Sequence, residues 1–315
     1  MSSPAISTRA LRKDYGPHTA LHGLDLLVPR GSVYGLIGPN GAGKTTTLRM
    51  LLDIIRPTSG EISVLGEDPR AGGAALRRRI GYVPGELRWG TRLRGGALLR
   101  HLAEISGPVR PGAIEQLAER LGLDLARPVR ALSKGNRQKL GLVQALMHEP
   151  ALLVLDEPTS GLDPLVQREF LALIREARDR GQTVLLSSHV LSEIQQAADD
   201  VAVLAEGRVV AEGPVATLRL ASVRRIHATL AGSSAESVRG ALQSTPGVEA
   251  LEVAEAPTGG LVRVSATSRG DIDPVLRVLT ASTVRELTVE EPDLEESVLG
   301  LYEAESRPRH RRARP

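Results

Sequence analysis

The chain has 315 residues, enough for one large core and a smaller second domain, since domains usually span roughly 100 to 200 residues. It contains no cysteine, which excludes a disulfide framework and a thiolate metal site and predicts an intracellular protein. The 40 Lys and Arg residues against 37 Asp and Glu residues give a net charge of +3.

The positive charge is concentrated at the C-terminal end, in Arg307, Arg309, Arg311, Arg312 and Arg314. Without these arginines the rest of the chain is close to neutral, so a basic face for nucleic acid is not expected. No apolar run approaches the roughly 20 residues that cross a bilayer. Any role at a membrane therefore requires a separate partner.

Residues 4–37 alternate apolar and polar positions and end in a β-rich run, Ser32–Ile37, which predicts a strand. The segment Gly38-Pro39-Asn40-Gly41-Ala42-Gly43-Lys44-Thr45 follows directly and fits the pattern G-x-x-x-x-G-K-[ST]. In this loop backbone N–H groups cradle phosphates, the lysine reaches the terminal ones, and the Thr hydroxyl ligates Mg²⁺. A helix is expected over residues 45–55, stopped by Pro57.

Helical spacing of apolar residues then runs through a region of about residues 88–150, which predicts a helical insert. Within it, Leu132-Ser133-Lys134-Gly135-Asn136-Arg137-Gln138 places a serine and a glycine just ahead of a helix start. Free amides and the helix dipole make such a start a second anion site.

Residues 151–205 alternate strands and helices, which predicts a mainly parallel sheet covered on both faces. The first strand ends in Asp156-Glu157, at the edge where open α/β sheets bind ligands. We expect Asp156 to hold Mg²⁺ through its waters and Glu157 to orient the attacking water, the alternative being acids that cap the next turn. His189 follows a later strand at the same edge and is expected to contact the terminal phosphate. The alternative is that it has no functional role, as is usual for an isolated histidine.

Beyond residue 220 the expected order changes to strand, helix, two strands, helix and strand, with a last helix at residues 294–303. This βαββαβ order predicts a small α+β domain over residues 221–303. Residues 304–315 form a basic tail, which we expect to be disordered.

In order along the chain, these motifs resemble those of the ATP-binding subunits of ABC transporters over roughly residues 5–220. The phosphate loop with Thr46 corresponds to Walker A, Leu132–Gln138 to the signature, Leu152–Asp156 with Glu157 to Walker B, Ser160–Asp163 to the D-loop, and His189 to the switch histidine. The resemblance implies a P-loop NTPase fold with a mainly parallel sheet, an antiparallel β subdomain and the helical insert. It also implies that the ring of Tyr15 stacks on adenine, unless Tyr15 is a buried core residue.

The resemblance implies the cofactors ATP and Mg²⁺, with Glu157 and His189 catalytic and Thr45 and Asp156 at the metal. Two subunits, identical or paralogous, would clamp two nucleotides, each between one Walker A loop and the other subunit's signature residues Ser133, Lys134, Gly135 and Gln138. The third partner would be a transmembrane permease, which places the chain at the cytoplasmic face of the membrane.

Two positions depart from the family pattern. Gly85 followed by Glu86 stands where the family usually has a glutamine, so either Glu86 replaces it or coupling to the metal is carried differently. Lys134 replaces the usual glycine of the signature, a variant that resembles bacterial drug and antibiotic exporters. Arg77-Arg78-Arg79 and Trp89 lie in the region that the family uses to hold its membrane partner, although charge runs are mostly solvated.

The leading hypothesis is an ATPase that powers export through a separate permease. The alternatives are an uptake ATPase whose C-terminal domain senses a ligand, and a soluble ABC ATPase that acts on ribosomes or DNA.

Overall fold

The computed structural model describes residues 3–87, 89–218, 223–256, 260–269 and 271–290. By its internal contacts the chain divides into two compact units, with the division between Val215 and Ala216. The first unit holds every motif that the sequence singled out.

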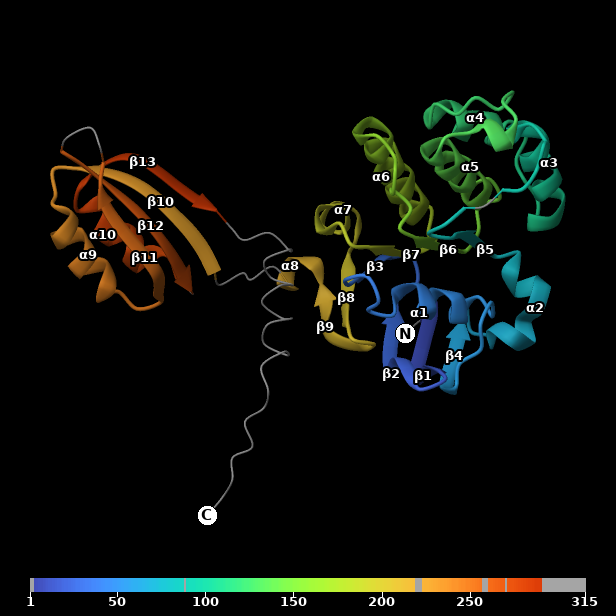
Figure 1. Cartoon of the computed structure of the whole chain (residues 1–315), viewed down its shortest axis with the longest axis horizontal. Coiled ribbons are helices and arrows are strands. Elements are labelled where there is room, and N and C mark those ends of the chain that lie inside the picture. Colours follow the sequence, from blue (N-terminus) through green and yellow to red (C-terminus); the bar gives the residue numbers. More distant parts are fainter. Residues whose placement is uncertain (1–2, 88, 219–222, 257–259, 270, 291–315) are drawn as a thin grey trace, which may run out of the picture. The chain divides into compact units, whose positions relative to one another are not determined.

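A six-stranded sheet forms the centre of the first unit, in the order β5-β6-β7-β3-β8-β9 (Figure 1). Five of these strands run parallel, and β9 pairs antiparallel to β8 at one edge. The bounds are β3 Val33–Ile37, β5 Ile80–Val83, β6 Leu152–Asp156, β7 Thr183–Ser188, β8 Asp200–Ala205 and β9 Arg208–Pro214. Every residue of β3, β6 and β7 is buried, because helices cover both faces of a parallel sheet. The predicted mainly parallel sheet is confirmed.

A second sheet in this unit is antiparallel and three-stranded, in the order β2-β1-β4. Its strands are β1 Ile6–Tyr15, β2 His18–Val28 and β4 Ser59–Val64. Helix α1 (Lys44–Leu51) lies between the two sheets, since Leu48 and Leu51 share one buried cluster with Ile6 of β1 and Val154 of β6. The antiparallel β subdomain of the expected fold is therefore present.

Helix α1 ends at Leu51, earlier than the expected limit of residue 55. Asp53 adopts a left-handed conformation (φ +54°), and the amide of Ile54 bonds back to the carbonyl of Arg49. This local turn ends the helix before Pro57 can.

The helical insert consists of α3 Gly95–Ser106, α4 Ala113–Arg120 and α5 Lys134–Leu146, with a short 3₁₀ turn η1 Val129–Ala131 before α5. The remaining helices of the unit are α2 Pro69–Arg77, α6 Pro164–Asp179 and α7 Leu191–Ala197. A short helix, α8 Val215–Leu218, begins at the last residue of the unit. Helix α6 has a side-chain cap, since Asp163 accepts hydrogen bonds from the amides of Leu165 and Val166.

The second unit has the predicted βαββαβ order and an antiparallel sheet with strands in the order β11-β12-β10-β13. Its elements are β10 Val223–Ala231, α9 Ala235–Gln243, β11 Val248–Glu255, β12 Leu261–Arg269, α10 Asp273–Thr280 and β13 Thr283–Glu290. Leu242 of α9 and Leu279 of α10 pack on Ile226 and Leu230 of the sheet to form a separate core. The α+β class expected for this part of the fold is present. The last helix expected at residues 294–303 and the basic tail 304–315 lie outside the described residues.

Candidate functional site

The loop between β3 and α1 has a backbone that only glycine can build at some positions. Gly41 and Gly43 lie in the left-handed region (φ +85° and +105°), and a Cβ on Gly38 would be 2.4 Å from the carbonyl oxygen of Leu204. Helix α1 starts at this loop without a side-chain cap. The amide groups of its first turn therefore point toward the loop and are suited to an anion.

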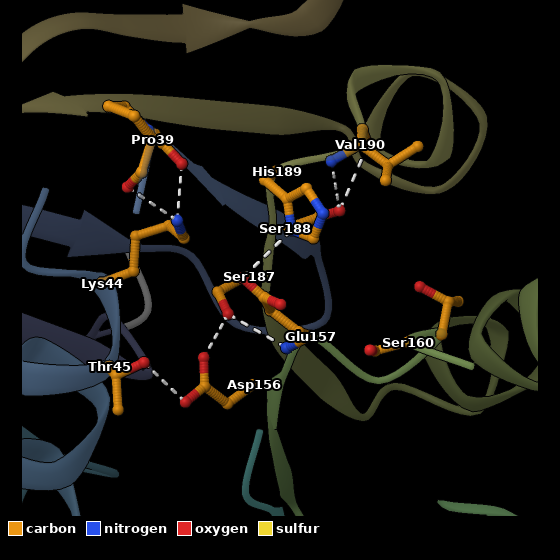
Figure 2. Close-up of polar contacts among 12 residues, drawn as sticks. Pro39, Lys44, Thr45, Asp156, Glu157, Ser160, Ser187, Ser188, His189 and Val190 are labelled. Atoms are coloured by element: carbon orange, nitrogen blue, oxygen red, sulfur yellow. Dashed lines mark hydrogen bonds and ion pairs between the residues drawn. The ribbon is translucent and has the colours of Figure 1, made fainter. Parts of the chain in front are cut away.

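Lys44 lies at the start of α1, buried under the loop. Its Nζ donates hydrogen bonds to the carbonyl oxygens of Gly38 and Pro39 (Figure 2). Burial lowers the pKa of Lys44, and the carboxylates of Glu157 and Asp156 oppose that effect. A phosphate in the loop would supply a further negative charge and favour the ammonium form.

Asp156 ends β6 and is 1% exposed. Its Oδ2 accepts a hydrogen bond of 2.8 Å from the Thr45 hydroxyl, and its Oδ1 accepts one of 2.6 Å from the Ser187 hydroxyl (Figure 2). A hydroxyl and a carboxylate at the foot of a phosphate loop are the oxygen donors that Mg²⁺ prefers. The donor set therefore fits a magnesium ion bound together with a nucleotide.

Glu157 and His189 lie at the same edge of the sheet, and Nδ1 of the histidine is 3.1 Å from Oε1 of the glutamate. Because an ionised carboxylate only accepts, Nδ1 carries the proton in this contact. Glu157 has a left-handed backbone (φ +47°), and its amide bonds to the carbonyl and the hydroxyl of Ser187 in β7. A turn of this kind directs the Glu157 side chain away from the strand axis and toward the loop.

A cavity of about 280 Å³ lies over the phosphate loop. It is lined by Tyr15, His18, Ala20, Pro39, Asn40, Gly41, Gly43, Lys44, Thr45, Thr46 and Glu157. Tyr15 is 47% exposed, so it is not a buried core residue, and Nζ of Lys13 lies 4.9 Å from the centre of its ring. The Tyr15 ring is thus accessible on one side of the cavity, where a flat base could stack. His18, which no sequence pattern singled out, also lines the cavity.

The signature begins helix α5 but contributes no residue to the lining of this cavity in the described chain. Ser133 caps the helix by accepting a hydrogen bond from the amide of Asn136, and Lys134 donates to the Ser160 hydroxyl at 3.2 Å. A Cβ on Gly135 would lie 2.6 Å from the carbonyl oxygen of Gly161. The start of α5 is therefore held closely against the segment that follows Glu157.

Gln138 differs from the other signature residues in its burial and its contacts. It is 3% exposed, and its Nε2 donates to the carbonyl oxygens of Pro158 at 3.0 Å and Glu157 at 3.5 Å. Gln138 lies one turn into α5 on its buried face. The spacing of residues in the sequence did not indicate this burial.

A family described as ABC transporter matches residues 21–160. The bacitracin transport ATP-binding protein BcrA of Bacillus licheniformis is 41% identical over 215 residues, which cover 67% of this chain and 70% of that protein. The chain belongs to the ATP-binding subunits of ABC transporters. As a member of this family, it is an ATPase.

Further relatives of this ABC ATPase agree with that assignment. The daunorubicin/doxorubicin resistance ATP-binding protein DrrA of Streptomyces peucetius is 39% identical over 243 residues, which cover 75% of this chain and 74% of that protein. A solved structure described as the ATP binding subunit of an ABC transporter superposes with a TM-score of 0.64 at 31% identity, covering 68% of this chain and 92% of that one. Among its described residues, the ABC ATPase has no helix long and apolar enough to cross a membrane.

Gly85, one of the two departures from the family pattern, lies beside Asp156 in this ABC ATPase. A Cβ built on Gly85 would lie 3.4 Å from Oδ2 of Asp156, so the backbone here passes beside the carboxylate proposed for the metal. Because residue 85 is a glycine, it places no side chain beside Asp156. Glu86 lines a neighbouring groove together with Arg77 and Trp89.

Proposed function

We propose that this ABC ATPase powers the export of a drug-like, antibiotic or lipid-like substrate through a separate transmembrane permease. The proposal is supported by relatives named for bacitracin transport and for daunorubicin and doxorubicin resistance. The observation that carries it in the structure is the convergence of the phosphate loop, Asp156, Glu157 and His189 at one edge of the central sheet.

In the proposed site, amides of Gly41 to Thr46 and the ammonium of Lys44 hold the phosphates of ATP, and the Tyr15 ring receives the adenine. Thr45 and Asp156 would hold Mg²⁺, which on binding neutralises charge on the phosphate oxygens. The Thr45 hydroxyl and the Asp156 carboxylate already lie together, so little reorganisation is required.

Hydrolysis then depends on two groups of this chain. The Glu157 carboxylate orients a water and takes one of its protons as the water oxygen bonds to the terminal phosphorus and the bond to the bridging oxygen breaks. The His189 ring keeps the Glu157 side chain in place through its Nδ1 proton. ADP and inorganic phosphate leave the site.

A second subunit, identical or paralogous, completes the site in this proposal. The cavity over the phosphate loop has no lining from the signature of the same chain, so Ser133, Lys134 and Gly135 of a partner would close over the nucleotide. The ammonium of Lys134 adds positive charge to that surface. Closure follows ATP binding and reopening follows hydrolysis, because only ATP makes contacts with both subunits.

The permease would dock on a groove of about 870 Å³ between α2 and α3. Apolar side chains form much of its wall, including Leu87, Leu102 and Ile105, the last of which is 57% exposed. Arg77 and Arg78 add positive charge, and the buried indole Nε1 of Trp89 has no hydrogen-bond partner within the part of the chain described. An exposed apolar groove with positive charge beside it suits a permease segment at the cytoplasmic face of the membrane.

The proposal is tested by co-purifying the chain with the membrane protein that accompanies it and reconstituting both in vesicles. ATP hydrolysis accompanied by movement of a substrate away from the ATPase side is expected, and the Lys44→Ala variant should abolish both. Hydrolysis with movement only toward the ATPase side, or with no movement of any substrate that the permease binds, would overturn the export function.

A further inference from the structure

Glu193 is a buried carboxylate that the hydrolysis mechanism does not use. It lies in the first turn of α7, one turn beyond His189, and it is 9% exposed. Its Oε2 accepts a hydrogen bond of 2.7 Å from the hydroxyl of Thr159, and the Ser188 hydroxyl lies 3.1 Å from the same oxygen. Ser188 also accepts a bond from the amide of Val190 and lies 3.2 Å from its carbonyl oxygen.

These contacts join two separate segments of the chain. Thr159 belongs to the segment Glu157-Pro158-Thr159 that follows β6, and Ser188 is the residue directly before His189. One carboxylate oxygen therefore links the segment that carries Glu157 to the segment that carries His189. Hydrogen bonds to a carboxylate are stronger than neutral ones, and burial increases their strength further.

The linked side chains need such support, because they are not fixed by packing. The side chain of His189 is 51% exposed and that of Glu157 is 27% exposed, yet they meet at 3.1 Å. Glu157 also has a left-handed backbone, which a non-glycine residue keeps only when its surroundings hold it there. Gln138 holds this segment on its other side through the carbonyl oxygens of Pro158 and Glu157.

We infer that Glu193 is a positioning residue for ATP hydrolysis, which sets the contact between Glu157 and His189 by holding Thr159 and Ser188 on one oxygen. The inference rests on the proposed roles of Glu157 and His189. The phosphate loop and Lys44 take no part in the link, so it affects the rate of hydrolysis and leaves ATP affinity unchanged.

Thr159→Val is the most direct test, since valine keeps the shape of the side chain and removes only the hydroxyl. In the full-length chain we expect kcat for ATP to fall about tenfold with the Kd for Mg-ATP unchanged. Thr159→Ser, which keeps the hydroxyl, should restore kcat. Thr8→Val is the matched control, because the Thr8 hydroxyl is also buried and bonded, to the carbonyl of Leu24 in the antiparallel sheet, far along the chain from the site.

Combination with His189→Ala separates positioning from a general loss of stability. If Glu193 acts through the contact with His189, Thr159→Val lowers kcat in the wild-type background and has no further effect in His189→Ala. An unchanged kcat in Thr159→Val, or an equal additional loss in the His189→Ala background, would overturn the inference. If His189→Ala alone retains full kcat, the proposed role of His189 fails first, and this inference fails with it.

Glu193→Gln carries the same test should Thr159→Val not fold. The amide oxygen still accepts but has no negative charge, so a smaller fall in kcat is expected, again absent in the His189→Ala background. A fall that persists at equal size in that background would contradict the inference.

Discussion

The hydroxyl of Thr45 and the carboxylate of Asp156 lie 2.8 Å apart, although 111 positions separate them in the chain. The contact joins the start of α1 to the end of β6, and it is possible because β6 and β3 are both paired to β7 in the same parallel sheet. The fold thus brings together the two residues that would hold Mg²⁺.

The first prediction concerns this pair. Thr45→Val removes the hydroxyl ligand, so the Mg²⁺ concentration for half-maximal ATP hydrolysis should rise about 10-fold or more, while Thr45→Ser should behave as wild type. A magnesium titration of ATPase activity measures the effect. Equal magnesium dependence in the valine and serine variants would remove Thr45 from the metal site.

Lys44 provides the second prediction. Lys44→Ala removes a buried ammonium from the phosphate loop, and the Kd for ATP, measured by calorimetry, should rise at least about tenfold, as expected for loss of a charge-assisted contact. Lys139→Ala is the matched control, since Lys139 lies in α5 and lines no part of the cavity over the loop. Unchanged ATP affinity in Lys44→Ala would count against the phosphate-loop assignment.

Replacement of Glu157 should separate binding from hydrolysis. Glu157→Gln keeps the size of the side chain but cannot accept the water proton, so kcat should fall about 100-fold to 10,000-fold while the Kd for ATP is retained. Single-turnover hydrolysis with labelled ATP measures the step. Normal turnover in this variant would show that another group activates the water.

The fourth prediction is a pH dependence of stability, from the Tyr34 hydroxyl, which donates to Oε1 of Glu212 at 2.5 Å. Burial, and then the Glu212 carboxylate, raise the pKa of Tyr34 above its ordinary value of about 10. Because the folded state keeps the proton to higher pH than the unfolded state, the contribution is complete below pH 10 and is lost as the pH rises further. Tyr34→Phe should cost about 1.5 to 3 kcal/mol at neutral pH.

Urea unfolding of wild type and Tyr34→Phe between pH 7 and pH 11 checks this sign. The difference between their free energies of unfolding should stay constant up to about pH 10 and then shrink. A difference that grows with pH above 10 would show that the pKa of Tyr34 is lowered in the folded state.

Much of the first unit could be predicted from the sequence, because its signals are local. The glycine loop between a buried strand and a helix, and the apolar run that ends in Asp156-Glu157, each predicted an element and its place at the sheet edge. The alternating pattern of the second unit likewise predicted its βαββαβ order. In both cases a short stretch of residues carries enough information to predict the secondary-structure element that it forms.

The parts that could not be predicted depend on contacts between distant segments. Strand β9 has no strong apolar run, since it is an edge strand paired only to β8 and none of its residues is buried. The sequence spacing did not indicate that the Gln138 side chain donates to the carbonyl oxygens of Glu157 and Pro158. No sequence pattern indicated a role for Ser187 or Glu193. Their partners at the site arise from the pairing of β6 with β7 and the packing of α7.

In the proposed mechanism ATP is held between two subunits, and the mass of the protein in solution tests this directly. Light scattering of Glu157→Gln should give a monomer without nucleotide and a dimer with saturating Mg-ATP, and Ser133→Arg in the same background should abolish the dimer because it crowds the signature. A lasting monomer in Mg-ATP, with the companion permease present or absent, would contradict the account.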